Sequence, residues 1–250
     1  MKVCSILITC ICLLTGKLAI GQPPLFITHG QIEFEYKVNL YSQMEGDNDE
    51  GWKEYVKKNL PQFKSTYFKL TFDQNKTLYE PGKENPDNNK LWMGEGVADE
   101  NVVYSDLVLR QSVSQKKAFE KVFLVKDSIR NIQWKITGET RKIAGFECRR
   151  ANAVIMDSIY VVAFYCDEIT TPGGPESFSG LPGMILGVAM PHEHVTWFAT
   201  KLSLQDVKPA DLRQPSRGKP INNAALKENL KESLKDWGKY ANKYVKQIML

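Results

Sequence analysis

The sequence has no excess of charge of one sign and only one long apolar run. Its 33 Lys and Arg residues are interspersed with 29 Asp and Glu residues, which leaves a formal net charge of +4. Proteins that bind nucleic acids generally gather positive charge on one face, so the mixed charges exclude such a partner. Beyond the first residues, no segment is long and apolar enough to span a membrane. We expect one domain with a sizeable hydrophobic core.

Residues that commonly carry catalysis are scarce or lie outside the motifs that activate them. The chain has only three histidines. Ser177 and Ser179 lie in a glycine-rich segment that lacks the Gly-x-Ser-x-Gly elbow of serine hydrolases. No Gly-Lys-Ser or Gly-Lys-Thr follows that segment, as a phosphate-binding loop requires. Asp167 and Glu168 point to opposite faces of an extended chain, so they form no acid-base pair. These absences favour a protein that is not an enzyme.

Residues 1–21 have the order of a secretory signal peptide. A lysine precedes the apolar run 3–14, and small residues precede the expected cleavage after Gly21. A membrane anchor is the alternative, but a mainly apolar run of twelve residues falls short of the roughly 20 that cross a bilayer. Cys10 and Cys12 raise the further alternative of a lipoprotein, although the residues before them are not small. We expect cleavage and export to the periplasm or the outer membrane of a Gram-negative envelope.

Three of the five cysteines lie in the predicted signal peptide, which leaves Cys148 and Cys166. These two bracket a pair of strand-like runs on either side of Asp157. A hairpin centred on Asp157 places them opposite each other, because each lies nine positions from the centre. Opposed residues of this kind have Cα atoms about 4.5 Å apart, at the short end of disulfide geometry. Because disulfides persist in exported proteins, we predict a bridge; two free buried thiols are the alternative.

Alternation of apolar and polar residues predicts a sheet. The first strand covers residues 31–40, a short helix at 52–58 ends before Pro61, and a hairpin joins 66–72 to 77–79. Further strand signals occur at 102–109, 118–125, 133–137, 141–144, 184–190 and 195–204. Closely spaced strands without regular intervening helices favour an antiparallel sheet. The predicted fold class is mainly β (α+β), a curved antiparallel sheet or open half-barrel.

The period of the apolar pattern changes near the end of the chain. We assign residues 22–208 to the β domain, 209–222 to a Pro-containing linker, and 223–250 to an amphipathic helix with apolar residues three or four apart. Asn222 or Asn223 can cap this helix. Packing on the sheet and docking to a partner or an anionic membrane surface remain open, because an apolar stripe needs a cover.

The segment from Thr170 to Gly183 contains four glycines and three prolines, which specify a defined irregular path. Within it, Gly180-Leu181-Pro182-Gly183-Met184-Ile185 resembles the central motif of the GLPGLI family of exported Bacteroidetes proteins, with Met184 in place of leucine. The similarity extends over about residues 134–188. Phe164 departs from it, since the family pattern has tryptophan there.

The resemblance implies an exported protein without an established activity, so it transfers no catalytic residue. It also implies an antiparallel sheet similar to that of periplasmic lipoprotein carriers, which wrap a curved sheet over apolar cargo; this is an analogy of fold. We expect Gly180, Leu181, Pro182 and Gly183 to form a structural corner of the sheet that borders a ligand groove.

His192, Glu193 and His194 form the only dense cluster of metal-ligand residue types in the sequence. Alternation on a strand would place both imidazoles on one face and Glu193 on the other. A zinc site would need a further ligand from elsewhere in the chain. A solvated turn after Pro191 is the alternative, and no other cofactor is expected.

Three functions remain open. The leading hypothesis is a non-catalytic envelope protein that binds an apolar or peptide-like ligand or assists an outer-membrane transporter. The second is a metal-binding protein or metal-dependent enzyme that uses His192 and His194. The third is a structural envelope component docked to a membrane by residues 223–250.

Overall fold

The computed structural model describes residues 26–44, 49–90, 96 and 98–250. The predicted signal peptide, residues 1–21, lies outside this part of the chain, so export stays a prediction. In the described residues, no helix has the length and apolar character needed to cross a membrane.

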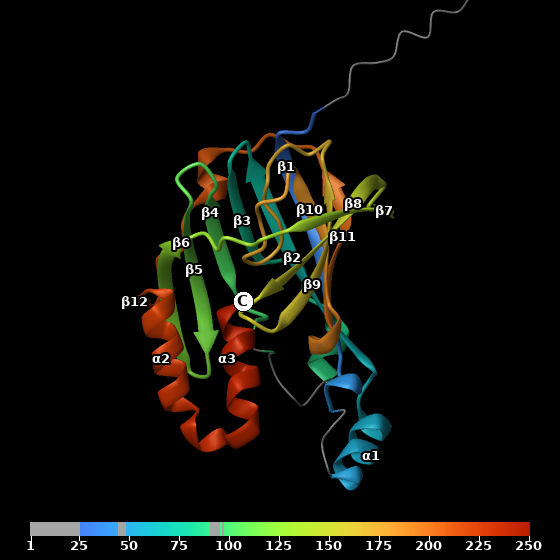
Figure 1. The fold of residues 1–250 in the computed structure, drawn as a ribbon, viewed down its shortest axis with the longest axis vertical. Helices are drawn as coiled ribbons and strands as arrows, with labels where there is room; N and C mark the ends of the chain where they lie inside the picture. Colours follow the sequence, from blue (N-terminus) through green and yellow to red (C-terminus); the bar gives the residue numbers. More distant parts are fainter. Residues whose placement is uncertain (1–25, 45–48, 91–95, 97) are drawn as a thin grey trace, which may run out of the picture.

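Twelve strands form a single open sheet (Figure 1) with the spatial order β12-β6-β5-β4-β3-β2-β1-β11-β10-β9-β8-β7. The first six strands are β1 (His29–Asn39), β2 (Phe63–Asp73), β3 (Lys76–Pro81), β4 (Val102–Asp106), β5 (Gln111–Ala118) and β6 (Lys121–Ser128). The others are β7 (Lys135–Ile143), β8 (Phe146–Ile155), β9 (Ile159–Cys166), β10 (Met184–Met190), β11 (Val195–Ser203) and β12 (Lys219–Ile221). All neighbours are antiparallel except β12 and β6. The predicted fold class is confirmed, with an open sheet rather than a closed barrel.

Strand β1 lies at the centre of the sheet. It pairs along its length with β2 on one side and with β11 on the other. Its alternating residues Ile32 and Phe34 are fully buried and join the main core. In Figure 1, strands β7–β9 cross β1–β3 at a steep angle, so the sheet bends around a concave face. That face carries the core and the site described below.

The hairpin of β8 and β9 is centred on Asp157, as predicted, with Ile155 paired to Ile159 and Arg149 to Tyr165. One more step in this register places Cys148 opposite Cys166. The predicted disulfide is wrong for this structure, because both residues are free, fully buried thiols. The Cys148 thiol donates to the Phe146 carbonyl oxygen of its own strand at 3.6 Å.

The C-terminal segment forms two helices instead of the single helix predicted for 223–250. Helices α2 (Asn223–Ser233) and α3 (Ala241–Met249) are separated by a turn in which Gly238 has a φ of +54°, a conformation that glycine adopts without a Cβ penalty. Asn222 caps α2 by accepting from the Ala225 backbone N–H.

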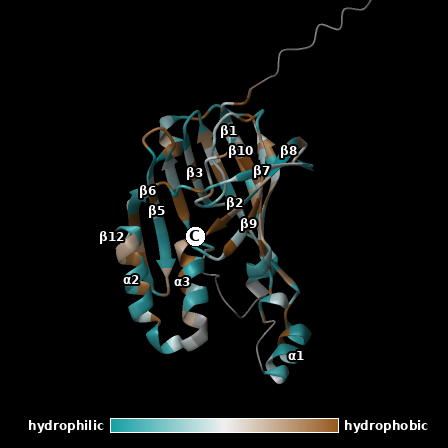
Figure 2. Cartoon of the chain, viewed as in Figure 1, coloured by the Kyte–Doolittle hydropathy of each residue, from teal (hydrophilic) through white to brown (hydrophobic). Residues whose placement is uncertain are grey.

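The apolar stripe of these helices packs on the sheet. A second hydrophobic cluster contains α2 and α3 side chains together with Ala118, Phe123 and Val125 of the β5–β6 hairpin. In Figure 2, the ribbons of α2 and α3 are coloured mainly teal and white, which marks mostly hydrophilic residues. The predicted linker contributes β12, which pairs in parallel with β6. Most of the stripe is therefore covered by the protein's own sheet, although Trp237 is 43% exposed; docking to a partner or a membrane surface stays a prediction.

The remaining helix, α1 (Glu50–Asn59), matches the predicted short helix and begins at an Asp49 cap. Asp49 accepts from the Trp52 backbone N–H at 2.9 Å. Pro61 follows closely and cannot continue the helix. In Figure 1, α1 projects from the sheet at one end of the long axis.

The Gly180–Gly183 segment folds back against the sheet. Leu181 is buried in the main core, and the Trp134 indole N–H donates to the Ser179 carbonyl oxygen at 2.9 Å. Gly183 has a φ of +151°, and a Cβ at this position would lie 2.2 Å from the Cys166 carbonyl oxygen. Backbone of the loop therefore lies directly on β9, at a distance that only glycine permits.

A Gly183→Ala substitution is expected to lower the free energy of unfolding by about 3 kcal/mol or more, because it adds both φ strain and a clash with backbone. Urea denaturation of purified protein measures the change. Gly138→Ala is the matched control, since a Cβ there meets nothing within 4 Å, and its effect should stay within about 0.5 kcal/mol. Equal effects of the two substitutions would contradict the close approach at Gly183.

Candidate ligand-binding site

A cavity of about 230 Å³ lies between the sheet and the C-terminal helix. Its apolar wall comes from β1, β10, β11, the start of β9 and Leu250. These residues are Val38, Ile159, Met190, Val195, Trp197 and Leu250. Polar side chains at one side include Tyr36, Asp99 and Glu176. Apolar walls with a few placed polar groups are typical of small-molecule sites.

An aromatic pair forms part of the sheet-side wall. Tyr36 of β1 and Trp197 of β11 are directly paired across the strands. Their rings stack with centroids 4.6 Å apart and planes 26° apart, and Phe178 packs edge-on to Trp197 at 5.9 Å. Cross-strand aromatic pairs stabilise a sheet and hold each other's ring orientation. The cavity therefore has a rigid aromatic surface.

Glu176 supplies a buried carboxylate at the polar side of the cavity. Its side chain is 1% exposed and forms an ion pair with Lys116 of β5, with 3.3 Å between Nζ and Oε1. Asn101 Nδ2 donates to the same oxygen at 2.8 Å. Glu176 has a φ of +52°, which is uncommon for a residue with a Cβ and occurs where surrounding structure holds the backbone.

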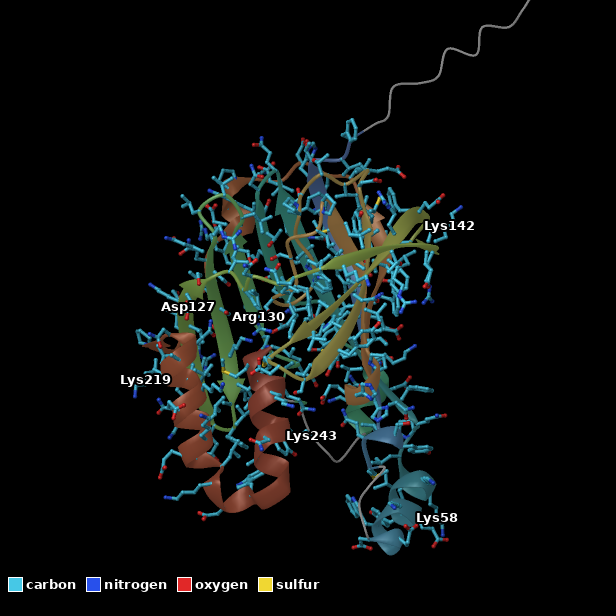
Figure 3. All side chains as sticks on the ribbon, viewed as in Figure 1. Lys58, Asp127, Arg130, Lys142, Lys219 and Lys243 are labelled. Atoms are coloured by element: carbon cyan, nitrogen blue, oxygen red, sulfur yellow. The ribbon has the colours of Figure 1, made fainter. Side chains whose placement is uncertain are left out.

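Lys116 connects this carboxylate to helix α3. Its ammonium group also donates to the Ile248 carbonyl oxygen at 3.1 Å. Arg130 donates to the Met249 carbonyl oxygen, beside the end of α3 (Figure 3), and Ser177 donates to that of Leu250. Cationic and hydroxyl donors satisfy the carbonyl groups that a helix leaves unpaired at its C-terminus. These bonds hold α3 in place as a wall of the cavity.

Asp99 is the second carboxylate at the cavity. It forms an ion pair with Lys64 at 2.6 Å and accepts from the Gly96 backbone N–H at 2.7 Å. Burial raises the pKa of Tyr36 well above its ordinary value, and the negative charges of Asp99 and Glu176 add to this rise. Burial lowers the pKa of Lys116, and the Glu176 carboxylate opposes part of that shift. The charges of both carboxylates therefore reach the Tyr36 hydroxyl at the polar side of the cavity.

The structure separates the other predicted site residues from this cavity. Pro191, His192 and Glu193 form a 3₁₀ turn between β10 and β11, and His194 has a left-handed φ of +55°. The expected strand with both imidazoles on one face is wrong, because the strand ends before Pro191. Lys243 and Lys246 share the same surface hollow as the two histidines, and positive charge there disfavours a cation.

The described residues contain no group of three or more His, Cys, Asp or Glu side chains that could hold a metal ion. The histidine pair thus gains no third ligand from the described part of the chain. Gly180–Gly183 also lie apart from the cavity lining, whereas Glu176 of the same loop contributes to it. The loop is therefore close to the site, but through a residue that the sequence interpretation passed over.

Part of the chain is similar to a protein family of unknown function. A family model described as "Protein of unknown function (Porph_ging)", which is associated with Bacteroidetes, matches residues 153–187. This segment runs from β8 into β10 and includes Glu176 and the Gly180–Gly183 turn. No curated protein matches the chain.

One protein of known structure shares the fold at low sequence identity. PNGF-II, in two crystal forms, has a TM-score of 0.52 and 13% identity over 80% and 81% of this chain. The chain spans about a third of the length of PNGF-II, 32% and 33%. An uncharacterized conserved protein from Thermus thermophilus has a TM-score of 0.40 and 6% identity over 78% of this chain and 90% of its own. The likeness to PNGF-II shows the fold alone.

We expect Lys116→Met to lower the free energy of unfolding by about 3–5 kcal/mol, because it leaves the buried Glu176 carboxylate without its cation. Chemical denaturation measures the loss. Lys117→Met is the matched control: Lys117 is the next residue, its side chain is 38% exposed, and it pairs with the exposed Glu100. Its replacement should cost about 0–1 kcal/mol. Similar losses for both variants would rule out a special role for the buried pair.

The two thiols should be unreactive in the folded protein. Burial raises the pKa of Cys148 to about 12 and also raises that of Cys166, and the thiolate is the reactive form. We expect N-ethylmaleimide at about pH 8 to label both residues after denaturation and neither before it, as read by peptide mass mapping. Failure to label denatured, unreduced protein would instead reveal a disulfide.

These pKa shifts also predict the effect of alkali. Each raised thiol pKa contributes stability that is fully present below the ordinary value of 9.0 and is lost as the pH rises through the folded value, about 12 for Cys148. A Cys148→Ala variant should therefore lose less stability than wild type between these limits. Parallel curves of unfolding free energy against pH would contradict this assignment.

Proposed function

We propose that the chain is an exported, non-catalytic envelope protein that binds an apolar or peptide-like ligand in the cavity beneath α3. The observation that carries the proposal is the cavity itself, with an apolar wall, a stacked aromatic pair and two carboxylates at one side. Export is supported by the signal-like order of residues 1–21. The motif Gly180–Ile185 and its resemblance to exported envelope proteins point to the periplasm or outer membrane.

The size of the cavity bounds the ligand. Drug-sized ligands generally occupy sites of roughly 300–1,000 Å³, and this cavity is about 230 Å³. It suits a short apolar molecule, or one end of a longer chain such as an acyl tail or a peptide side chain. Transfer of such a ligand to an outer-membrane transporter is the envelope role that we propose with it.

Filling the cavity should weaken binding of a short apolar probe. Val195 is buried and lines the cavity, so Val195→Phe should weaken binding of hexan-1-ol by about tenfold or more, about 1.4 kcal/mol. Calorimetric titration and the shifts of backbone amide resonances report the affinity. Circular dichroism checks the fold, because overpacking itself costs about 1–3 kcal/mol.

Val154→Phe is the matched control, since Val154 is 59% exposed on β8 and does not line the cavity. It should leave hexan-1-ol binding unchanged. Native mass spectrometry of protein purified from the cells that make it should also show a retained small molecule. Wild-type protein that binds no apolar probe and retains no ligand would overturn the proposed function.

A further inference from the structure

The two oxygens of the Glu176 carboxylate differ in their hydrogen bonds. Asn101 and Lys116 both donate to Oε1, and no described residue donates to Oε2. The Glu176 side chain is 1% exposed, so Oε2 is screened from most of the solvent. Glu176 lines the cavity, so the cavity is where a ligand meets this atom.

The charges around the cavity leave that oxygen free to receive a cation. Three carboxylates line the cavity, from Asp99, Glu176 and Glu193, against the ammonium groups of Lys64 and Lys246. Lys64 is engaged by Asp99 at 2.6 Å. Lys246 donates to the Ser158 hydroxyl at 2.6 Å.

Lys116 and Arg130 both balance the Glu176 charge, and neither of them lines the ligand cavity. Lys116 contacts Oε1, and both cations line a separate cavity of about 390 Å³. Neither lysine of the cavity lining forms an ion pair with Glu176. The cavity therefore presents a carboxylate oxygen that can accept a hydrogen bond from a ligand. A buried carboxylate oxygen without a donor is costly to keep, and a ligand donor would remove that cost.

Aromatic faces add a second reason to expect a positive group. Tyr36, Trp197 and Tyr244 line the same cavity as Glu176. Ring faces attract ammonium groups, most strongly when water is excluded. A carboxylate oxygen and aromatic side chains around one small cavity are the features that recognise an ammonium group attached to an apolar body.

We propose that the cavity selects ligands with an ammonium head and an apolar body, with the head at Glu176 Oε2 and the body against Val195 and Trp197. The inference rests on the proposed ligand-binding function and names its ligand class. The amino terminus of an apolar peptide and the head group of an aminolipid share this chemistry.

Three six-carbon probes test the charge preference in wild-type protein by calorimetric titration. Hexylamine, protonated at neutral pH, should bind about tenfold or more tightly than hexan-1-ol, and hexanoate should bind most weakly. Equal binding of the amine and the alcohol, or tighter binding of hexanoate, would overturn the ammonium preference while leaving the proposed function intact. Absence of binding by all three would overturn both.

Glu176→Gln should abolish the preference of hexylamine over hexan-1-ol, measured as the ratio of the two dissociation constants in the same variant. Because it leaves Lys116 buried without a partner, the double variant Glu176→Gln/Lys116→Met serves as a second test with both charges removed. Glu100→Gln, outside the cavity lining, should keep the full preference. Retention of the preference in either Glu176 variant would show that another group binds the amine and would reject the assignment.

Two matched pairs of ligands separate the sources. Leucyl-leucine amide and its N-acetyl derivative test a peptide amino terminus. Lysophosphatidylethanolamine and lysophosphatidylglycerol test an aminolipid head group. Preference for the ammonium-bearing member of either pair supports the inference and identifies its source, and absence of preference in both pairs, as in the hexyl series, overturns it.

Discussion

The ion pair between Lys116 and Glu176 joins three parts of the chain that are distant in sequence. Lys116 lies on β5, Glu176 lies in the loop before β10, and the same ammonium group holds the Ile248 carbonyl oxygen at the end of α3. A buried ion pair adds little net stability over an apolar pair of similar volume, but loss of one partner is costly. We infer that its main effect is to fix where the loop and the helix lie. The cavity exists because those two elements are held above the sheet.

The opposite wall of the cavity is rigid for a different reason. Tyr36 and Trp197 belong to neighbouring central strands, and both strands are hydrogen-bonded on each side. Their side chains therefore move only if the middle of the sheet moves. A ligand in the cavity would contact this fixed aromatic surface on one side and, on the other, a helix held by side-chain hydrogen bonds. Such a combination pre-organises a site and lowers the entropy lost on binding.

Much of the fold could be predicted from local patterns. The alternation in β1, the register of the β8–β9 hairpin about Asp157, and helix α1 before Pro61 all follow from short-range chemistry. Strand β5 was missed because Gln111–Ala118 is polar, and one of its buried positions is Lys116. The break at Gly238 was missed because the apolar spacing continues across it. In both places tertiary packing overrides the local pattern.

The site itself was less accessible to sequence reasoning than the fold. A lysine on the buried side of a strand and a glutamate in a glycine- and proline-rich loop look like ordinary surface charges until the sheet brings them together. The register around the two cysteines was predicted correctly, but both thiols are free, because a disulfide needs a specific side-chain geometry that sequence spacing does not contain. The histidine pair failed for a local reason, since Pro191 converts the expected strand into a turn.

The Gly180–Gly183 turn and Glu176 belong to one loop whose contacts depend on each other. Gly183 lies against the β9 backbone, Leu181 is buried in the core, and the Ile185 backbone N–H donates to the Gly173 carbonyl oxygen at 2.8 Å. These contacts close the loop on itself and fix both of its ends, so Glu176 between them is held in a left-handed conformation that it would rarely adopt alone. The turn therefore affects the site indirectly. Gly183 and Leu181 anchor the loop, and the anchored loop places the Glu176 carboxylate at the cavity.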